Sequence, residues 1–275
     1  MNAFRQTRLH PLNLAHRGAS AYAPENTLAA FRSAAEIGAD GVELDAKLSR
    51  DGAIVAMHDA SVDRTTDGSG RVSALTLAEL KRLDAGSKFD PKFGGERVPT
   101  LDEVVDAVGD RLLINVELTN YESRGDGLEL KVAEFIVKRG LAERVMVSSF
   151  NPLGLRKVKR ASPDVVCGLL TRPGLKFILR RLFLAPLVPG LDAHHPQHVM
   201  IDAAFVRRVH ARGQRVNTWT VNDEADMRRV IEWGVDSIIT DRPDVLRQIT
   251  TDKWIQAHQA LQPIARTPHA IRNMR

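Results

Sequence analysis

Hydrophobic and polar positions follow two different periods along most of the chain. From residue 14 almost to residue 249, short apolar or β-branched runs are separated by stretches in which apolar residues recur every three to four positions. The short runs predict buried strands of a parallel sheet, and the longer stretches predict amphipathic helices. The strand candidates are 14–16, 41–47, 112–118, 145–149, 165–170, 191–194, 215–220 and 237–240.

The helical stretches alternate regularly with these strands. Several of them are followed by glycine, which favours the left-handed backbone of a helix C-terminal cap. An eightfold strand–helix alternation without a long low-complexity linker predicts one α/β barrel of the TIM type, and the length of 275 residues agrees with this. The helix candidates are 25–37, 101–108, 128–139, 153–160, 203–212 and 224–233.

Two segments depart from the alternation. Residues 59–99 follow the second strand and break the rhythm, so we expect a small insertion there. Residues 250–275 carry two prolines and a basic excess, and we expect a C-terminal basic tail outside the barrel. The predicted barrel therefore spans residues 1–249.

The composition favours a globular protein with a large core, since 43% of the residues are hydrophobic and 27% are charged. Cys167 is the only cysteine, which excludes an intramolecular disulfide and a thiolate metal cage. The first residues lack the apolar stretch of a secretory signal, so we expect a cytoplasmic protein. Nothing in the sequence indicates an oligomeric state.

The net charge of +5 is unevenly distributed. Residues 171–190 carry +4 and residues 251–275 carry +3, which leaves −2 on the other 230 residues. Since the body of the protein is not basic and no nucleic-acid motif is present, we do not expect a nucleic-acid partner.

Acidic side chains lie within two predicted strands. Glu43 and Asp45 are two residues apart in GVELDAK and therefore point to one face, and Glu117 lies near the end of LLINVELT. Strand ends meet at one rim of a barrel, where three carboxylates would repel one another. A hard divalent ion, Mg²⁺ or Ca²⁺, would resolve this repulsion. The alternative is a structural ion pair of Glu43 or Asp45 with Lys47 or Arg17.

Two histidines and an arginine also lie at strand ends. His16 and Arg17 end the first strand, and His58 follows an extra apolar run at 54–57. A single histidine at such a position usually has a structural role, but two of them beside carboxylates favour catalysis. With a metal ion they suit phosphodiester cleavage, because Arg17 would neutralise phosphate charge while one imidazole accepts a proton and the other donates one.

Several motifs together resemble the glycerophosphodiester phosphodiesterase family. They are LAHRGASAYAPENTLAAF, GADGVELDAKLSRDGAIVAMHDASVDRTTDGSG, VPTLDEVV, VMVSSFNP, VNTWTVND and GVDSIITDRP. The resemblance covers roughly residues 13–248, and it implies a TIM barrel with an inserted region after the second strand.

The resemblance also implies roles for individual residues. It makes His16 and His58 the acid–base pair and Arg17 a phosphate ligand. Asn26 would hold the geometry of the site, and Trp219 would line the substrate pocket, although Trp219 could equally pack in the core. The implied metal ligands are Glu43, Asp45 and Glu117.

One position departs from the family. The family usually has Glu-x-Lys after the third strand, with the lysine near the phosphate, whereas this chain has Thr119 after Glu117 and Leu118. Thr119 could donate a neutral hydrogen bond to the substrate in its place. The resemblance implies hydrolysis of a small glycerophosphodiester to glycerol 3-phosphate and an alcohol, and it leaves open which histidine is the acid.

Residues 175–190 (LKFILRRLFLAPLVPG) allow two interpretations. They fit an amphipathic barrel helix, which we favour, or a peripheral membrane contact that would make the enzyme a lysophospholipase D. An alternative from another class is a non-catalytic barrel that binds a phosphate ester or a metal.

Overall fold

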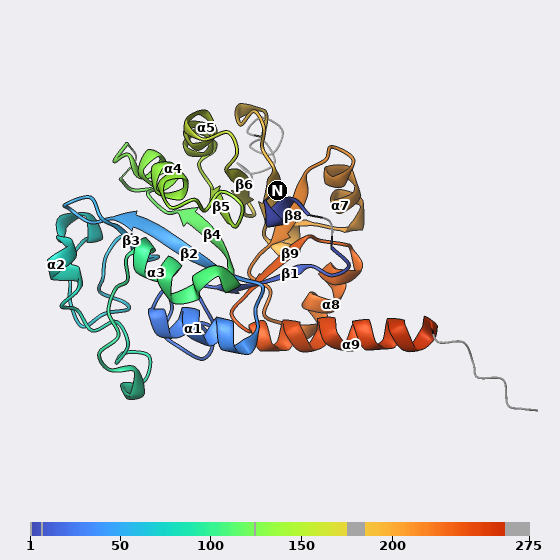
Figure 1. The fold of residues 1–275 in the computed structure, drawn as a ribbon, viewed down its shortest axis with the longest axis horizontal. Coiled ribbons are helices and arrows are strands. Elements are labelled where there is room, and N and C mark those ends of the chain that lie inside the picture. Colours follow the sequence, from blue (N-terminus) through green and yellow to red (C-terminus); the bar gives the residue numbers. More distant parts are fainter. Residues whose placement is uncertain (1, 7, 124, 175–184, 262–275) are drawn as a thin grey trace, which may run out of the picture.

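The computed structural model describes residues 2–6, 8–123, 125–174 and 185–261 of this protein (Figure 1). Within them, eight parallel strands form a barrel, which closes because the first strand pairs with both the second and the last. The predicted fold is confirmed. The barrel strands are β1 (Leu12–His16), β2 (Gly41–Leu48), β4 (Leu113–Leu118), β5 (Val145–Ser149), β6 (Val166–Thr171), β7 (Ala193–Pro196), β8 (Arg215–Thr218) and β9 (Ser237–Thr240).

The extra strand β3 (Ile54–Ala56) runs antiparallel to β2 as a hairpin. The chain after it forms a separate lobe at one edge of the barrel, with its own buried cluster that includes Val62, Leu80 and Val98 (Figure 1). This lobe corresponds to the expected insertion. It contains η2 (Val72–Ala74), α2 (Leu77–Leu80) and η3 (Pro91–Phe93).

Helices surround the barrel and bury apolar side chains against the outer faces of the strands (Figure 1). Side chains fix the start of some helices, as in α3 (Leu101–Val108), where Thr100 and Glu103 form a capping box. The larger helices are α1 (Leu28–Ile37), α3 (Leu101–Val108), α4 (Leu128–Lys138), α5 (Pro152–Ala161), α7 (Ala203–His210), α8 (Glu224–Glu232) and α9 (Pro243–Leu261), and the remaining short turns are η1 (Ala3–Arg5), η4 (Gly109–Arg111), η5 (Ala185–Leu187) and η6 (His198–Met200).

Two of the larger helices differ clearly from the prediction. The first was expected from residue 25 but begins at Leu28, because the Thr27 side chain caps the amide of Ala30 and Asn26 has a left-handed backbone with φ 57°. Helix α9 was not predicted, and it crosses residue 249, where we expected the barrel to end.

The barrel contains an apolar cluster that includes Leu14, Met146 and Ile239. Asn217 Nδ2 donates to His195 Nε2 at 2.8 Å. Burial lowers the pKa of His195 to about 3, so the imidazole is neutral. The barrel therefore encloses a neutral polar pair.

Gly168 on β6 is required by this packing. A Cβ atom at this position would lie 2.2 Å from Nε2 of His195. The absence of a side chain thus makes room for an imidazole inside the barrel.

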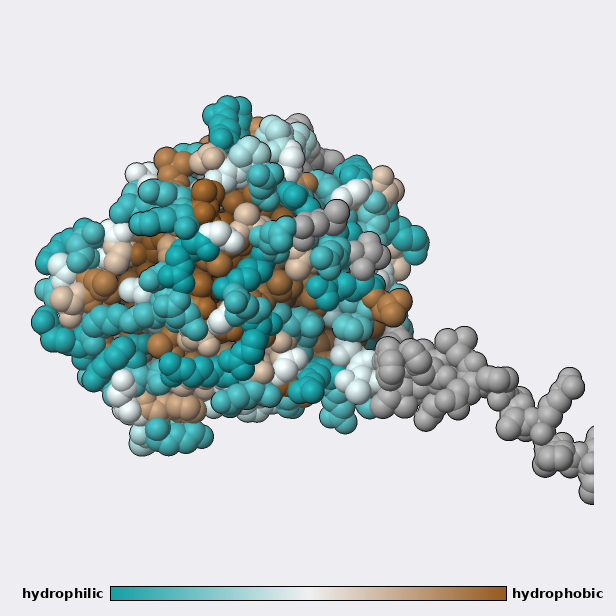
Figure 2. All heavy atoms as spheres, viewed as in Figure 1, coloured by the Kyte–Doolittle hydropathy of each residue, from teal (hydrophilic) through white to brown (hydrophobic). Residues whose placement is uncertain are grey.

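The surface is mostly hydrophilic on the face drawn in Figure 2, with hydrophobic side chains visible between polar ones near its centre. Among the described residues, no helix combines the length and the hydropathy needed to cross a membrane. Residues 175–184 lie outside the described residues, so the two interpretations of 175–190 stay predictions. The cytoplasmic location also stays a prediction.

Candidate functional site

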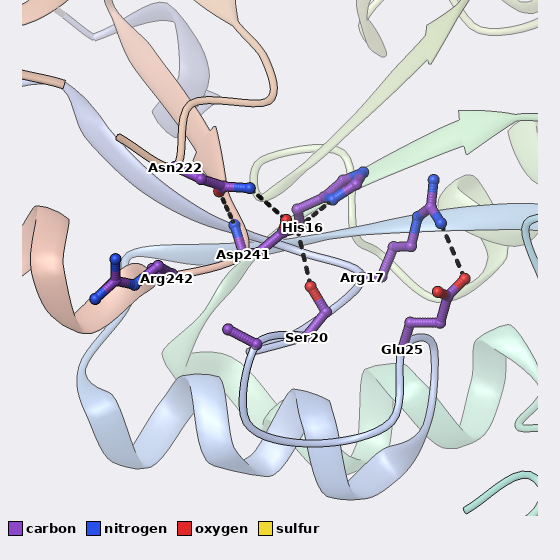
Figure 3. A pocket seen from close by; sticks show the side chains of 8 residues that line it. His16, Arg17, Ser20, Glu25, Asn222, Asp241 and Arg242 are labelled. Carbon is purple, nitrogen blue, oxygen red and sulfur yellow. Dashed lines mark hydrogen bonds and ion pairs between the residues drawn. The ribbon is translucent and has the colours of Figure 1, made fainter. Parts of the chain in front are cut away.

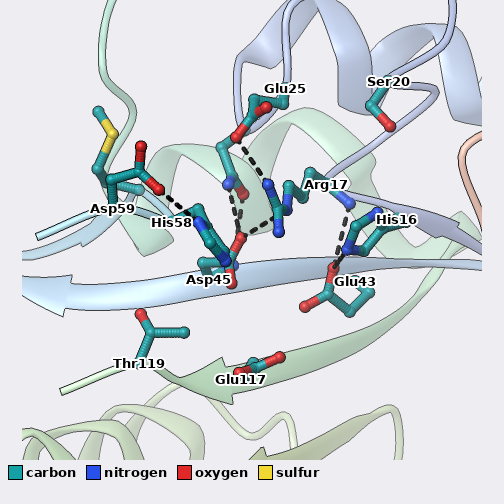
Figure 4. A network of polar contacts seen from close by, with 12 residues as sticks. His16, Arg17, Ser20, Glu25, Glu43, Asp45, His58, Asp59, Glu117 and Thr119 are labelled. Carbon is teal, nitrogen blue, oxygen red and sulfur yellow. Dashed lines mark hydrogen bonds and ion pairs between the residues drawn. The ribbon is translucent and has the colours of Figure 1, made fainter. Parts of the chain in front are cut away.

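Three carboxylates meet at the mouth of the barrel, as the sequence predicted. Glu43 and Asp45 lie on the same face of β2, and Asp45 is aligned with Glu117 of the neighbouring β4 (Figure 4). Each of the three residues offers one oxygen, and these oxygens lie within 4.8 Å of one another. This spacing brings all three within reach of one ion.

The electrostatics of the cluster fit a cation. Glu43 and Asp45 are 3% and 1% exposed. Burial, then the neighbouring Asp45 and Glu117, raises the pKa of Glu43 well above its ordinary value, and burial together with Asp45 raises the pKa of Glu117 to about 8. Among the described groups, Glu43 Oε1 has no hydrogen-bond partner. A divalent ion would supply both the missing partner and the missing charge.

Arg17 holds two of these carboxylates from the first strand–helix loop. Its backbone is left-handed, with φ 57°, and this conformation turns its amide toward Glu43 Oε2 at 3.1 Å. Its guanidinium forms ion pairs with Asp45 Oδ2 at 3.1 Å and with Glu25 Oε1 at 2.9 Å. A strained conformation of this kind costs on the order of 1–3 kcal/mol and is typical of functional sites.

Asn26 orients Asp45 directly. Its Nδ2 donates to Asp45 Oδ2 at 2.9 Å, and its Oδ1 accepts from the Asp45 amide at 3.4 Å. Asn26 is 4% exposed and also has a left-handed backbone. Its observed contact is therefore with a predicted metal ligand rather than with the open pocket.

His16 is fixed by a carboxylate that the sequence analysis missed. His16 Nδ1 lies 2.6 Å from Asp241 Oδ1, and its Nε2 lies 4.0 Å from Glu43 Oε2. Burial would raise the pKa of Asp241, but hydrogen bonds from His16, Ser20 and Asn222 outweigh it and hold the pKa at about 2 (Figure 3). The anionic Asp241 keeps the proton on Nδ1 and leaves Nε2 facing the carboxylate cluster.

His58 has a similar partner. Its Nδ1 lies 2.6 Å from Asp59 Oδ1, and Arg64 binds the other oxygen of Asp59 at 2.6 Å. The hydrogen bond from Arg64 holds the pKa of Asp59 at about 2. Arg64 also makes two hydrogen bonds to Glu25. Glu25 in turn binds Arg17 (Figure 4). The inserted lobe is thus connected to the first strand–helix loop by paired charges.

His58 reaches the site by a different route from the one we expected. The sequence predicts His58 at the end of an extra strand on the rim of the barrel, and this strand, β3, runs antiparallel to β2. The chain turns back along β2, and the amide of Met57 donates to the carbonyl of Asp45 at 2.8 Å. The hairpin therefore places His58 beside Asp45.

Two cavities open near the carboxylates. The smaller, of about 310 Å³, is lined by His16, Arg17 and Asp241 among others (Figure 3). The larger is a cleft of about 1280 Å³ whose walls include His58 and Glu117. The two histidines thus open toward different cavities.

Thr119 and Trp219 were the other predicted substrate contacts. Thr119 lines the cleft, but its hydroxyl donates to the carbonyl of Ala46 at 2.9 Å. Trp219 Nε1 donates to the carbonyl of His195 at 2.7 Å, and its ring packs edge-on against Phe150, a cleft residue, at 5.6 Å. Trp219 therefore packs against a residue of the cleft wall, and its role in lining the substrate pocket stays a prediction.

Tyr121 is a further residue that the sequence analysis missed. Its hydroxyl donates to Glu117 Oε1 at 2.9 Å and accepts from the Phe150 amide at 3.1 Å. Asp241 could have been identified from the sequence, because it directly follows the last strand. Tyr121 lies in an irregular loop, where no sequence pattern indicates a site residue.

Comparisons with known proteins agree with this geometry. The model of the glycerophosphoryl diester phosphodiesterase family matches residues 16–245. A glycerophosphodiester phosphodiesterase of Caldanaerobacter subterraneus is 44% identical over 236 residues, which cover 86% of this chain and 96% of the relative. A Bacillus subtilis glycerophosphodiester phosphodiesterase is 33% identical over 252 residues, with 86% of each chain covered.

A solved structure is similar over the same region. A phosphodiesterase from Oleispira antarctica, in complex with the product sn-glycerol-3-phosphate, is 30% identical, with a TM-score of 0.77 and coverage of 88% of this chain and 97% of that one. This chain belongs to the glycerophosphoryl diester phosphodiesterase family and is a phosphoric diester hydrolase.

Proposed function

We propose that this protein hydrolyses small glycerophosphodiesters to glycerol 3-phosphate and an alcohol, with a divalent metal ion at Glu43, Asp45 and Glu117 and with His16 and His58 transferring protons. The observation that carries this proposal is the set of three carboxylate oxygens within 4.8 Å of one another, beside two histidines that each pair with an aspartate. The product complex of the Oleispira relative supports the assignment of glycerol 3-phosphate.

The donor atoms favour a hard ion. All three side chains offer carboxylate oxygen, which suits Mg²⁺ or Ca²⁺. When bound, such an ion would act as a Lewis acid on the phosphoryl oxygens. Asn26 and Arg17 keep Asp45 oriented toward the cluster.

The two histidines divide the proton transfers. In each neutral imidazole, Nδ1–H donates to an aspartate, so that the Nε2 lone pair can accept a proton from the attacking nucleophile. The protonated form of the other imidazole can give its Nε2 proton to the leaving alkoxide oxygen. Both assignments fit the contacts, because His16 and His58 have equivalent aspartate partners.

Metal removal tests this function. We expect EDTA treatment followed by gel filtration to lower the rate of glycerol 3-phosphate release from glycerophosphocholine by at least ~10²-fold, since a metal contributes several kcal/mol of charge stabilisation. Activity should return with Mg²⁺, Ca²⁺ or Mn²⁺ added singly. Full turnover by the EDTA-treated protein, with metal content checked by mass spectrometry, would contradict the proposal.

A second candidate function is the removal of the head-group alcohol from lysophospholipids. The observation that favours it is the apolar part of the large cleft, which includes Leu153, Leu170 and Leu187, the first of them 55% exposed. Choline release from lysophosphatidylcholine, compared with release from glycerophosphocholine at equal concentration, decides between the two. The non-catalytic alternative has no support, because the chain keeps the carboxylates and the histidines and belongs to a family of hydrolases.

A further inference from the structure

Lys47 extends the row of functional side chains on β2. It follows Asp45 by two residues, so both side chains point to the same face of the strand. Asp45 is aligned with Glu117 of β4, and Lys47 is therefore level with Thr119, one step closer to the barrel mouth. The Lys47 side chain lines the 1280 Å³ cleft together with His58 and Glu117.

The ammonium group of Lys47 has capacity for a further partner. Its Nζ donates to the backbone carbonyl of Thr119 at 2.5 Å. Among the described residues, no carboxylate lies within ion-pair distance of this nitrogen. An ammonium has three N–H donors, so two remain for a ligand. Because a partly buried cation without an anion is costly, an anion bound in the cleft would stabilise Lys47.

The other described cations near the cleft pair with carboxylates or lie over an aromatic ring. The guanidinium of Arg17 forms ion pairs with two carboxylates of the site. Arg71 binds Glu122 at 3.1 Å and is 56% exposed, and Arg172 lies over the ring of Phe150, 5.9 Å from its centroid. Lys47 is therefore the cleft cation that is both adjacent to the carboxylate cluster on its strand and free of an acidic partner among the described residues.

Thr119 provides no positive charge at the cleft, so a cation there must come from another residue. The sequence resemblance to the family implies a lysine at this position. Here the Thr119 hydroxyl donates its hydrogen to the carbonyl of Ala46, and the residue is 4% exposed. Lys47 Nζ donates to the Thr119 carbonyl, so the neighbouring strand brings a positive charge next to this residue.

We propose that Lys47 binds a phosphoryl oxygen of the substrate and thereby supplies, from β2, the cation that the family resemblance implies at position 119, just after β4. This inference rests on the proposed function, and it names a substrate-binding residue in addition to the metal ligands and the histidines. The ligand it recognises is a phosphate ester, for which glycerol 3-phosphate and inorganic phosphate are suitable probes.

The test is a Lys47→Met variant of the metal-loaded protein, with glycerol 3-phosphate binding measured by isothermal titration calorimetry. Methionine removes the charge and keeps much of the apolar stem. We expect the dissociation constant of glycerol 3-phosphate to rise roughly 10- to 100-fold, as for the loss of a hydrogen bond to a charged group, and KM to rise with it. Metal affinity should stay within about twofold of the wild type if Lys47 contacts only the phosphate.

Lys131→Met is the matched control. Its Nζ also donates to a backbone carbonyl, that of Gly52 at 2.9 Å, but it lies on α4 outside the cleft. A Thr119→Lys change in the Lys47→Met background returns a cation from β4, and we expect it to recover at least part of the phosphate affinity. Lys47→Gln serves as a second variant if Lys47→Met is unstable by thermal denaturation.

Two results would overturn the inference. One is phosphate affinity in Lys47→Met equal to that of Lys131→Met. The other is an equal loss of metal and phosphate affinity, which would mean that Lys47 acts only through the carboxylates. Since binding of inorganic phosphate needs no turnover, a wild type that binds it through Lys47 but hydrolyses no glycerophosphodiester would refute the proposed function and leave this inference standing.

Discussion

Replacing His16 by alanine is expected to lower kcat for glycerophosphocholine by roughly 10²–10⁴-fold, the usual contribution of a general acid or base. His16 Nδ1 is held by Asp241 at 2.6 Å, and its Nε2 lies 4.0 Å from Glu43, so alanine removes an imidazole that faces the carboxylate cluster. The rate is measured as glycerol 3-phosphate formation at saturating substrate and metal. Metal binding, measured separately, should persist because an imidazole is not among the three ligands.

His210→Ala is the control for this change. His210 also pairs with an aspartate, since its Nε2 lies 2.7 Å from Asp236 Oδ2, but it lies on α7 with its side chain 37% exposed. We expect this variant to retain wild-type kcat. If His16→Ala were as active as His210→Ala, the catalytic role of His16 would have to be given up.

Glu117→Gln is expected to abolish metal-dependent activity and yet to stabilise the metal-free protein. Burial with Asp45 raises the pKa of Glu117 to about 8, so at pH 7 the metal-free protein must take up a proton at this carboxylate when it folds. Glutamine removes this cost and should raise the melting temperature without metal, while metal affinity should fall by at least ~10²-fold because a ligand is lost. Differential scanning fluorimetry with and without Mg²⁺ measures both effects.

Glu129→Gln gives the matched comparison. Glu129 is 2% exposed, like the site carboxylates, but its partner is Lys157 at 3.3 Å and it lies outside the cluster. Its substitution should lower stability and leave the response to metal unchanged. A Glu117→Gln protein that is less stable without metal and still stabilised by Mg²⁺ would show that the carboxylates do not form an ion site.

The fold could be predicted because hydrophobic residues recur with different periods in strands and in helices, and because the strand–helix pair is repeated many times. A single missed element does not change such a pattern. The pattern does not predict helix boundaries reliably, as α1 shows by beginning later than expected. Residues 25–27 have the composition of a helix start, but Asn26 takes a left-handed backbone in order to contact Asp45. That contact is tertiary, so no local pattern could indicate it.

The site was predictable where it follows from strand alternation. Glu43, Asp45 and Glu117 come together because their strands are neighbours in register. Asp241 reaches His16 across 225 residues of sequence, and the backbone of Thr119 accepts a hydrogen bond from Lys47 across 72. Such pairings depend on barrel closure and on side-chain direction, which a single sequence does not reveal.

The most direct test of the central claim is a crystal structure of the protein with Mn²⁺ and glycerol 3-phosphate, in which the metal is located by anomalous scattering. We expect one peak within coordination distance of Glu43, Asp45 and Glu117, about 2.0–2.6 Å from their oxygens, with a phosphate oxygen as a further ligand. The phosphorus should lie between His16 and His58. A peak at other residues, or a phosphate bound away from these three carboxylates, would contradict the account.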